Sequence, residues 1–361
     1  MNNLKKFFAL MLCLALMITC FAGCHKKGEI AVKIGDIEFT SGYYACALVN
    51  ADTEARAKVE EGLSEDELKG EIKYWKHQVE KTDYTEWVEK TALDTLVELA
   101  AIKTLCAENK VELDSETKAL ANSNAEYLWD TYGYSALMEP NGVAKETFIN
   151  YMTDTYLSNE YFEFLYGKGG EKEIAADKVL KQLTDNYVLV NKLEVSFSGL
   201  NEDQITEKKN QLAGYEASLK DGSQTFEQVY LAYNNIKEED HKHEEAEEGE
   251  TLPQDQHATV LGAEETDFAS DYYDNAKEMA VGEVKLITLE DNEGLVLLVK
   301  KDITADPYYI EEYDLTLRQD IVGEDYTKDI AEYGKKLSCD VNKSSTKQFK
   351  VKNITYPQAA Y

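Results

Sequence analysis

The chain is poor in cysteine, and the few that it has are widely scattered. Of six cysteines, only Cys46, Cys106 and Cys339 lie beyond residue 24. An odd number of distant thiols argues against a disulfide framework and against a zinc site built on them, because such a site needs clustered ligands. Long apolar runs are also missing after residue 24. We therefore expect no membrane-spanning segment in that part of the chain.

The short motifs of common enzymes are missing as well. The sequence has no P-loop, no dinucleotide fingerprint, no nucleophile elbow and no HExxH pair. Each of these motifs places groups that its chemistry requires, so a conventional hydrolase or nucleotide-dependent enzyme is unsupported.

Positive charge is scarce. Lysine and arginine total 38 against 69 aspartates and glutamates, for a net charge of −31. Such a field repels nucleic acid and anionic lipid surfaces, so neither is an expected partner. The composition is nevertheless 43% apolar with 24 tyrosines, which is enough to build two globular units.

The N-terminus has the order of a secretory signal. Residues 1–23 carry two lysines, then the apolar run Phe7–Phe21, then two small residues before Cys24. The stretch Phe21–Cys24 resembles a lipobox, which implies cleavage before Cys24 and lipidation of its sulfur. Removing residues 1–23 lowers the net charge to −33, because they contain two lysines and no acidic residue. We expect an extracytoplasmic protein anchored to the cell membrane through lipid; the alternative is an ordinary signal peptide that contains a cysteine by chance.

The N-terminal half is predicted to be helical after a short hairpin. Strand-like alternation surrounds Gly35 and Asp36, a pair suited to a two-residue turn. Capping residues and apolar periodicity then predict helices over residues 41–61, 64–81, 84–109, 115–132 and 144–166. The last helix carries an aromatic stripe that includes Phe148, Tyr151 and Phe162. The stripe is interpreted either as a client-binding groove or as the core of the helical bundle.

The second half alternates strands with helices. Strands are expected over residues 187–197, 258–261, 284–289 and 295–301, with helices over 201–220, 225–233 and 267–279. One long amphipathic helix follows over 308–337, and a final strand over 348–354. The small domain that precedes this helix is too short to cover its whole apolar stripe. We therefore expect the long helix to pack against the N-terminal helices.

An acidic segment interrupts this half. Residues 237–255 carry nine acidic residues against two lysines and almost no large apolar residue, which predicts a solvated loop. His241, His243 and His257 lie in or beside it and are chemically able to bind Zn²⁺ or Ca²⁺ with neighbouring carboxylates. Nothing in their spacing fixes a coordination geometry, so the prediction is a charged loop with no metal and no cofactor.

Several short sequence motifs, none of them specific alone, occur in the order found in a known family. They are Val32–Thr40, Asp221–Phe226, Val260–Gly262, Val281–Val284 and Gly294–Lys300. With the lipobox and the helix order, the chain resembles the PrsA and SurA class of extracytoplasmic foldases. The resemblance implies an α+β fold in which a mostly helical N- and C-terminal chaperone module carries an inserted parvulin-like βα-β domain.

The resemblance also implies domain boundaries. A signal peptide would span residues 1–23, the N-terminal helical module 24–186, and the parvulin-like domain 187–303. Residues 304–361 would supply a helix and strand that pack back on the N-terminal module.

Parvulin-type peptidyl-prolyl isomerases use two histidines and a Cys or Asp beside an apolar proline pocket. The corresponding positions here fall near Lys192, Tyr233 and Val296, and none keeps the family residue. Phe268 is the candidate for the pocket aromatic, and a plain core role is the alternative. The isomerase domain is therefore predicted to be degenerate.

The expected function is that of a chaperone that binds unfolded or nascent secreted proteins. The alternatives are an active isomerase with a rearranged site, and a surface lipoprotein that binds a solute or metal. The sequence does not indicate the oligomeric state.

Overall fold

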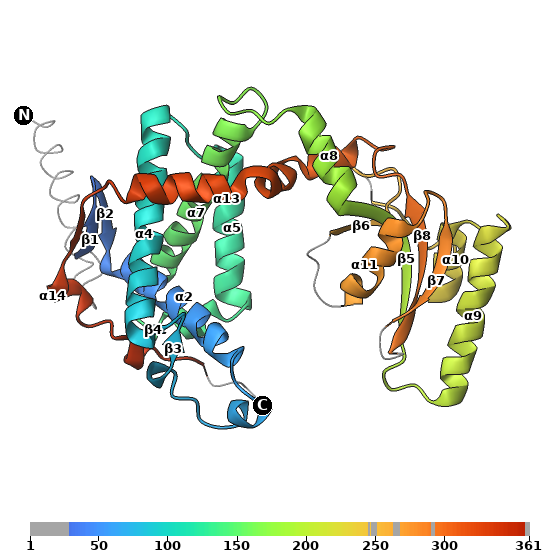
Figure 1. Ribbon diagram of the computed structural model, residues 1–361, viewed down its shortest axis with the longest axis horizontal. Helices are drawn as coiled ribbons and strands as arrows, with labels where there is room; N and C mark the ends of the chain where they lie inside the picture. Colours follow the sequence, from blue (N-terminus) through green and yellow to red (C-terminus); the bar gives the residue numbers. More distant parts are fainter. Residues whose placement is uncertain (1–28, 245, 247–250, 263–267, 290–292, 358–361) are drawn as a thin grey trace, which may run out of the picture. The chain divides into compact units, whose positions relative to one another are not determined.

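The computed structural model describes residues 29–244, 246, 251–262, 268–289 and 293–357 (Figure 1). Helices and small sheets are mixed, as in the α+β class. The chain divides into two compact units. The N-terminal unit comprises residues up to Leu165 together with those from Asp325 onward, and the second unit comprises Tyr166–Glu324.

The N-terminal unit contains a three-stranded sheet that joins the two ends of the chain. β1 (Ile30–Ile34) and β2 (Ile37–Thr40) form an antiparallel hairpin, which confirms the prediction from sequence. Its turn needs Gly35, whose φ is +55°. β9 (Cys339–Val341) pairs with the other edge of β1, so the strand order is β2-β1-β9.

The strand expected over residues 348–354 is not present. This segment holds the short 3₁₀ turn η3 (Val351–Asn353), which follows the short helix α14 (Lys343–Thr346). The prediction was wrong because β9 already occupies the open edge of β1, and because the apolar side chains of the segment pack on the helical core instead. Val351 is 3% exposed there.

Long helices build the core of the N-terminal unit. α2 (Ser41–Glu60) and α4 (Tyr84–Asn109) pack against each other, and both match the sequence-based boundaries within one residue. α4 begins where it does because the Asp83 carboxylate accepts hydrogen bonds from the first free backbone N–H groups of the helix. α5 (Ser115–Thr131), α6 (Tyr134–Met138) and α7 (Lys145–Tyr166) complete the unit.

The helix predicted over residues 64–81 was also wrong. The structure has a single turn there, α3 (Glu65–Leu68), then the 3₁₀ turn η1 (Tyr74–Lys76). A two-residue hairpin of β3 (Gln78–Val79) and β4 (Thr82–Asp83) follows. Its turn residues, Glu80 and Lys81, have φ of 51° and 69°, which a helix cannot contain.

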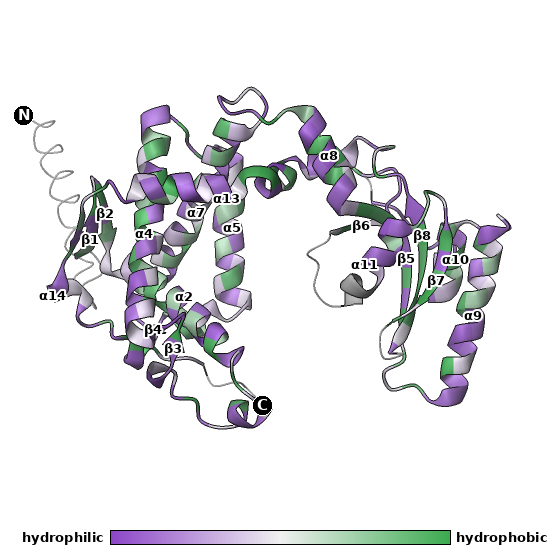
Figure 2. Cartoon of the chain, in the orientation of Figure 1, coloured by the Kyte–Doolittle hydropathy of each residue, from purple (hydrophilic) through white to green (hydrophobic). Residues whose placement is uncertain are grey.

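The second unit is a four-stranded antiparallel sheet covered on both faces. The strands β5 (Tyr187–Ser196), β6 (Ala258–Gly262), β7 (Val284–Thr288) and β8 (Gly294–Lys301) are ordered β6-β5-β8-β7. β8 is drawn largely in the green of apolar residues, as expected of a central strand buried on both sides (Figure 2).

Helices supply the two covering layers of that sheet. On one face, α11 (Phe268–Glu278) packs its aromatic residues Tyr272 and Tyr273 against the sheet core. On the other face lie α9 (Glu202–Lys220) and α10 (Phe226–Asn234), which contribute Leu212 and Val229.

The long helix predicted over residues 308–337 is divided in the structure. α12 (Tyr308–Glu312) ends at Tyr313, and α13 (Asp314–Gly334) begins directly after it. None of the helices within the described ranges is long and apolar enough to cross a membrane.

The two halves of α13 belong to different units. In the second unit, the buried guanidinium of Arg318 donates to the carbonyl oxygens of Tyr166 and Ile174, ahead of α8 (Ala176–Asn186). In the N-terminal unit, Tyr326 packs edge-on against Phe162 with ring centroids 5.2 Å apart.

Candidate functional site

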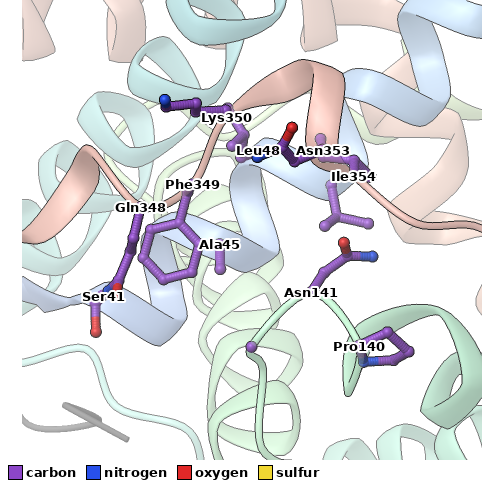
Figure 3. A pocket seen from close by; sticks show the side chains of 12 residues that line it. Ser41, Ala45, Leu48, Pro140, Asn141, Gln348, Phe349, Lys350, Asn353 and Ile354 are labelled. Carbon is purple, nitrogen blue, oxygen red and sulfur yellow. The ribbon is translucent and has the colours of Figure 1, made fainter.

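The N-terminal unit contains a cleft of about 300 Å³ (Figure 3). Its apolar floor is formed by one face of α2, through Ala45, Leu48 and Val49. Its walls are the loop Pro140–Gly142 and the segment Gln348–Ile354. The cleft is therefore assembled from parts of the chain that are some 300 residues apart, and it exists only when the C-terminal segment is in place.

Hydrogen bonds and a close contact fix the two walls to each other. The side-chain amide of Asn141 donates to the carbonyl oxygen of Thr355 at 2.8 Å and accepts from its backbone N–H at 2.9 Å. Gly142 has φ of +86°, and a Cβ there would lie 3.2 Å from Cε1 of Phe349. Glycine is thus favoured at this position both by the backbone angle and by the approach of the aromatic wall.

A buried polar network anchors the end of the chain beside the cleft. The carboxylate of Asp52, 1% exposed, accepts hydrogen bonds from Tyr84 at 2.8 Å, Tyr356 at 2.9 Å and Arg56 at 2.8 Å. The guanidinium of Arg56 lies between the rings of Tyr74 and Tyr356, 4.2 and 3.9 Å from their centroids. Burial, followed by the charge of Asp52, raises the pKa of Tyr84 far above its usual value, so this phenol stays protonated and donates.

The aromatic stripe on α7 lies in the core. Phe148, Tyr151 and Phe162 are only 1%, 4% and 1% exposed. Phe148, for example, packs against Trp129 at a centroid distance of 5.3 Å. The structure thus favours the bundle-core interpretation of the stripe, and these side chains do not line the cleft.

Of the three positions mapped to the isomerase site, Tyr233 is separated from the other two. Lys192 projects from β5 toward α11, where its Nζ lies 3.0 Å from the hydroxyl of Tyr272. Val296 is fully buried in the same core cluster as Tyr272. Tyr233 packs on the opposite face of the sheet, with the cluster that contains Leu193. Neighbouring residues of a strand face opposite sides, so the sheet itself separates Tyr233 from Lys192 and Val296.

Two further candidates from the sequence cannot be placed. Cys24, the expected lipidation site, and the side chain of Phe268 lie outside the described residues.

The second unit brings three histidines and a glutamate together. The ligand atoms of Glu227, His241, His243 and His257 all lie within 4.8 Å of one another. The imidazoles of His241 and His257 stack with centroids 5.1 Å apart, and Nε2 of His243 lies 3.2 Å from Oε1 of Glu227. We call these four residues the histidine cluster.

The interior nitrogens of the histidine cluster are unsatisfied. Nε2 of His241 and Nε2 of His257 are both inaccessible to solvent and have no hydrogen-bond partner among the described residues. Burial, followed by repulsion from His241 and His243, lowers the pKa of His257, although Asp255 and Glu227 oppose this effect.

The sequence contains three histidines that are chemically able to bind a metal, but their spacing predicts no site, and it gives no signal for Glu227 or for the cleft. Glu227 lies in the first turn of α10, 14 residues before His241, and no local motif connects the two. The walls of the cleft, Asn141 and Phe349, are likewise distant in sequence. Both groupings depend on tertiary contacts, which leave no periodic signal in the sequence.

No protein-family model matches the chain, and no curated protein matches it in sequence. Among solved structures, it is similar to foldase protein PrsA from Streptococcus pneumoniae, with 13% identity and a TM-score of 0.39, over 68% of this chain and 83% of that one. It is also similar to foldase protein PrsA from Lactococcus lactis, with 11% identity and a TM-score of 0.39, over 90% of this chain and all of that one. Similarity at this level carries no argument about the activity of this chain.

Proposed function

We propose that this protein is a lipid-anchored extracytoplasmic chaperone that binds unfolded secreted polypeptides in the cleft of its N-terminal unit. The observation that carries the proposal is the cleft itself, with an apolar floor on α2 and a wall from the end of the chain. In this proposal, residues 24–186 and 304–361 form the chaperone module, and residues 187–303 form a parvulin-like domain carried between them.

The proposed mechanism is reversible burial of client side chains. A volume of about 300 Å³ is at the lower end for ligand pockets, so it suits one or two apolar side chains rather than a folded surface. Such contacts are weak individually and exchange quickly, as a holding chaperone requires. The client contacts proposed here involve Phe349 and Ile354 at the cleft instead of the buried aromatic stripe.

The test is to fill the cleft without disturbing the core. Asn353 lines the cleft and is exposed, so Asn353→Trp adds bulk at its mouth. The neighbouring Lys352 is exposed and does not line it, so Lys352→Trp is the matched control. We expect wild type and K352W to suppress aggregation of reduced, unfolded lysozyme in light-scattering assays, and N353W to lose most of this effect. Equal protection by all three proteins would contradict the proposed binding site.

The anchor is tested separately. Cys24→Ala should move the protein from the membrane fraction to the soluble fraction or block its maturation, because a single lipidated cysteine provides the proposed attachment. A C24A protein that is still processed normally and still sediments with membranes would refute the lipoprotein assignment.

Catalysis of prolyl isomerisation is not part of the proposal, since the sheet separates the mapped positions. A protease-coupled assay on a cis-proline peptide distinguishes the two functions, because the uncatalysed reaction takes tens of seconds. We expect no acceleration at protein concentrations that suppress aggregation. A rate that rises in proportion to protein concentration would establish an active isomerase.

A further inference from the structure

We propose that the histidine cluster, Glu227, His241, His243 and His257, is a binding site for one divalent transition-metal ion, with Zn²⁺ the best fit. This site is independent of the proposed client cleft, because all four residues belong to the second unit.

The distances among the four ligand atoms of the histidine cluster suit a metal ion. In a tetrahedral site with ligand bonds of 2.0–2.1 Å, the ligand atoms lie about 3.3 Å apart. The four atoms here are already within 4.8 Å of one another, so binding requires each to move inward by only about 1 Å. The side chains of His243 and Glu227 are 45% and 46% exposed and can rotate into place.

The buried nitrogens provide the second argument. A buried polar atom without a partner is destabilising, and proteins normally satisfy such atoms. Nε2 of His241 and Nε2 of His257 both lack a hydrogen-bond partner among the described residues, and Oε1 of Glu227 lies 3.9 Å from the first of them, too far for a hydrogen bond. A metal ion bound between them would satisfy both atoms at once, which makes a ligand a better explanation than a chance arrangement.

The surroundings hold the cluster in position. The backbone N–H of His257 donates to Asp255 at 3.1 Å, and that carboxylate is held by Asn191 of β5 and Lys301 of β8. The ring of Tyr230, on α10, lies 4.5 Å from that of His257. The backbone of His257 is therefore tied to the sheet, and its imidazole packs against α10, which preorganises this residue as a ligand.

The two stretches of chain that carry His243 and His257 are also hydrogen-bonded to each other. The backbone N–H of Glu244 donates to Oε1 of Gln256 at 2.7 Å, and Nε2 of Gln256 donates to the carbonyl oxygen of Glu244 at 2.9 Å. This pair of bonds keeps His243 and His257 on neighbouring stretches of backbone.

The ligand types select the class of metal. Imidazole nitrogens suit Zn²⁺, Cu²⁺ and Ni²⁺, whereas Ca²⁺ and Mg²⁺ prefer sets made of oxygen atoms. Three histidines and one glutamate fill a tetrahedral zinc shell with protein ligands, as in structural rather than catalytic zinc sites. The ion would be bound by residues of α10, of the acidic segment and of the position directly before β6. It would thus cross-link three parts of the second unit.

The experiment is a calorimetric titration of the metal-stripped full chain with ZnCl₂. We expect one ion per chain, unaffected by a large excess of MgCl₂ or CaCl₂. The double variant His241→Ala/His257→Ala should bind at least ~100-fold more weakly. His77→Ala, in the N-terminal unit, is the matched control and should bind like wild type. Co²⁺ provides a second readout, because a tetrahedral site gives it intense visible absorption.

Three results would overturn the proposal. They are the absence of both heat and the Co²⁺ spectrum in wild type, unchanged affinity in the double variant, and displacement of Zn²⁺ by Ca²⁺ at equal concentration. The last two would mean that the acidic residues bind cations without the imidazoles. Should the double variant fail to fold by circular dichroism, Glu227→Gln at an exposed position provides the same test and should weaken binding.

Discussion

Each unit of the molecule contains a polar cluster assembled from separate segments, and the two differ in how well their buried atoms are satisfied. In the N-terminal unit, Asp52 is 1% exposed and accepts hydrogen bonds from Arg56, Tyr84 and Tyr356. In the second unit, His241 and His257 each keep a buried nitrogen with no partner in the described structure. The buried carboxylate of the first cluster is surrounded by donors, whereas two buried nitrogens of the second have no hydrogen-bond partner among the described residues.

Whether its buried polar atoms have hydrogen-bond partners distinguishes a cluster that stabilises the fold from one that binds a ligand. When every buried polar atom of a network already has a hydrogen-bond partner, no atom is free to bind a ligand. Removing such a network should therefore lower the free energy of unfolding and leave ligand binding unchanged. A network with unpaired polar atoms destabilises the ligand-free protein, and it stabilises the fold only when a ligand binds to those atoms. Truncation, substitutions and added metal each test this distinction, with expected effects that range from the loss of a whole unit to almost none.

The largest effect is expected from ending the chain after Leu337. The truncation removes β9, Val351 and Tyr356, and with them one partner of the Asp52 network. We expect the N-terminal unit to lose more than about 5 kcal/mol, since each buried apolar side chain contributes about 1.5–3 kcal/mol, and to unfold without a sharp transition. Trp75, Trp87 and Trp129, the only tryptophans, all lie in this unit, so their fluorescence reports on it alone.

The second unit is an internal control, because it contains no residue beyond Glu324. Its transition, followed by circular dichroism, should be unchanged. A sharp and unshifted tryptophan transition in the truncated protein would show that the C-terminal segment is not needed for the fold.

Asp52→Asn should destabilise the N-terminal unit by about 3 kcal/mol, because it leaves the donors of a buried carboxylate poorly paired. The measurement is urea denaturation followed by tryptophan fluorescence. Glu54→Gln, on the same helix but 54% exposed, is the matched control and should change stability by less than about 0.5 kcal/mol. Similar small losses for both variants would mean that the network does not hold the chain end.

Zn²⁺ at about 100 times its dissociation constant should stabilise the second unit by about 2.7 kcal/mol. Calorimetric melting should show one transition that moves upward, while the transition reported by tryptophan stays in place. Addition of EDTA should reverse the shift, and His241→Ala/His257→Ala should not show it. An upward shift of the tryptophan transition instead would place the metal in the wrong unit.

The smallest effect is expected from His257→Phe in the presence of EDTA. The phenyl ring can keep the packing against Tyr230 while it removes the unpaired nitrogen, so stability should change by no more than about 1 kcal/mol. The same protein should no longer respond to Zn²⁺. A loss of about 3 kcal/mol or more in EDTA would show that the imidazole is already satisfied without metal.

Local signals were enough to predict α2 and α4 from the sequence. An apolar stripe with steps of three and four residues predicted α4, and the predicted bounds of α2 and α4 match the structure within one residue. The first hairpin was equally local, since Gly35 and Asp36 specify its turn.

The errors arose where tertiary structure decides. The capping box at Ser64 and Glu67 does start a helix, yet the left-handed turn at Glu80 and Lys81 makes the end of the same segment a hairpin. Residues 348–354 have the alternation of a strand, but β9 takes the available edge. The meeting of Glu227 with His257, and of Asn141 with Phe349, requires the folded chain and has no counterpart in any window of sequence.

The pairing of β1 with β9 has a consequence for the time at which this protein can finish folding. Ile34 meets Cys339, so the first sheet of the chain waits for nearly the last residues to be synthesised. Closing the loop of roughly 300 residues between them is entropically costly, and the pairing of segments so distant in sequence is slow. Until that pairing forms, β1 has one bare edge and the apolar face of α2 is uncovered. Each new copy therefore passes through an incomplete, aggregation-prone state of the kind that the finished protein is proposed to protect.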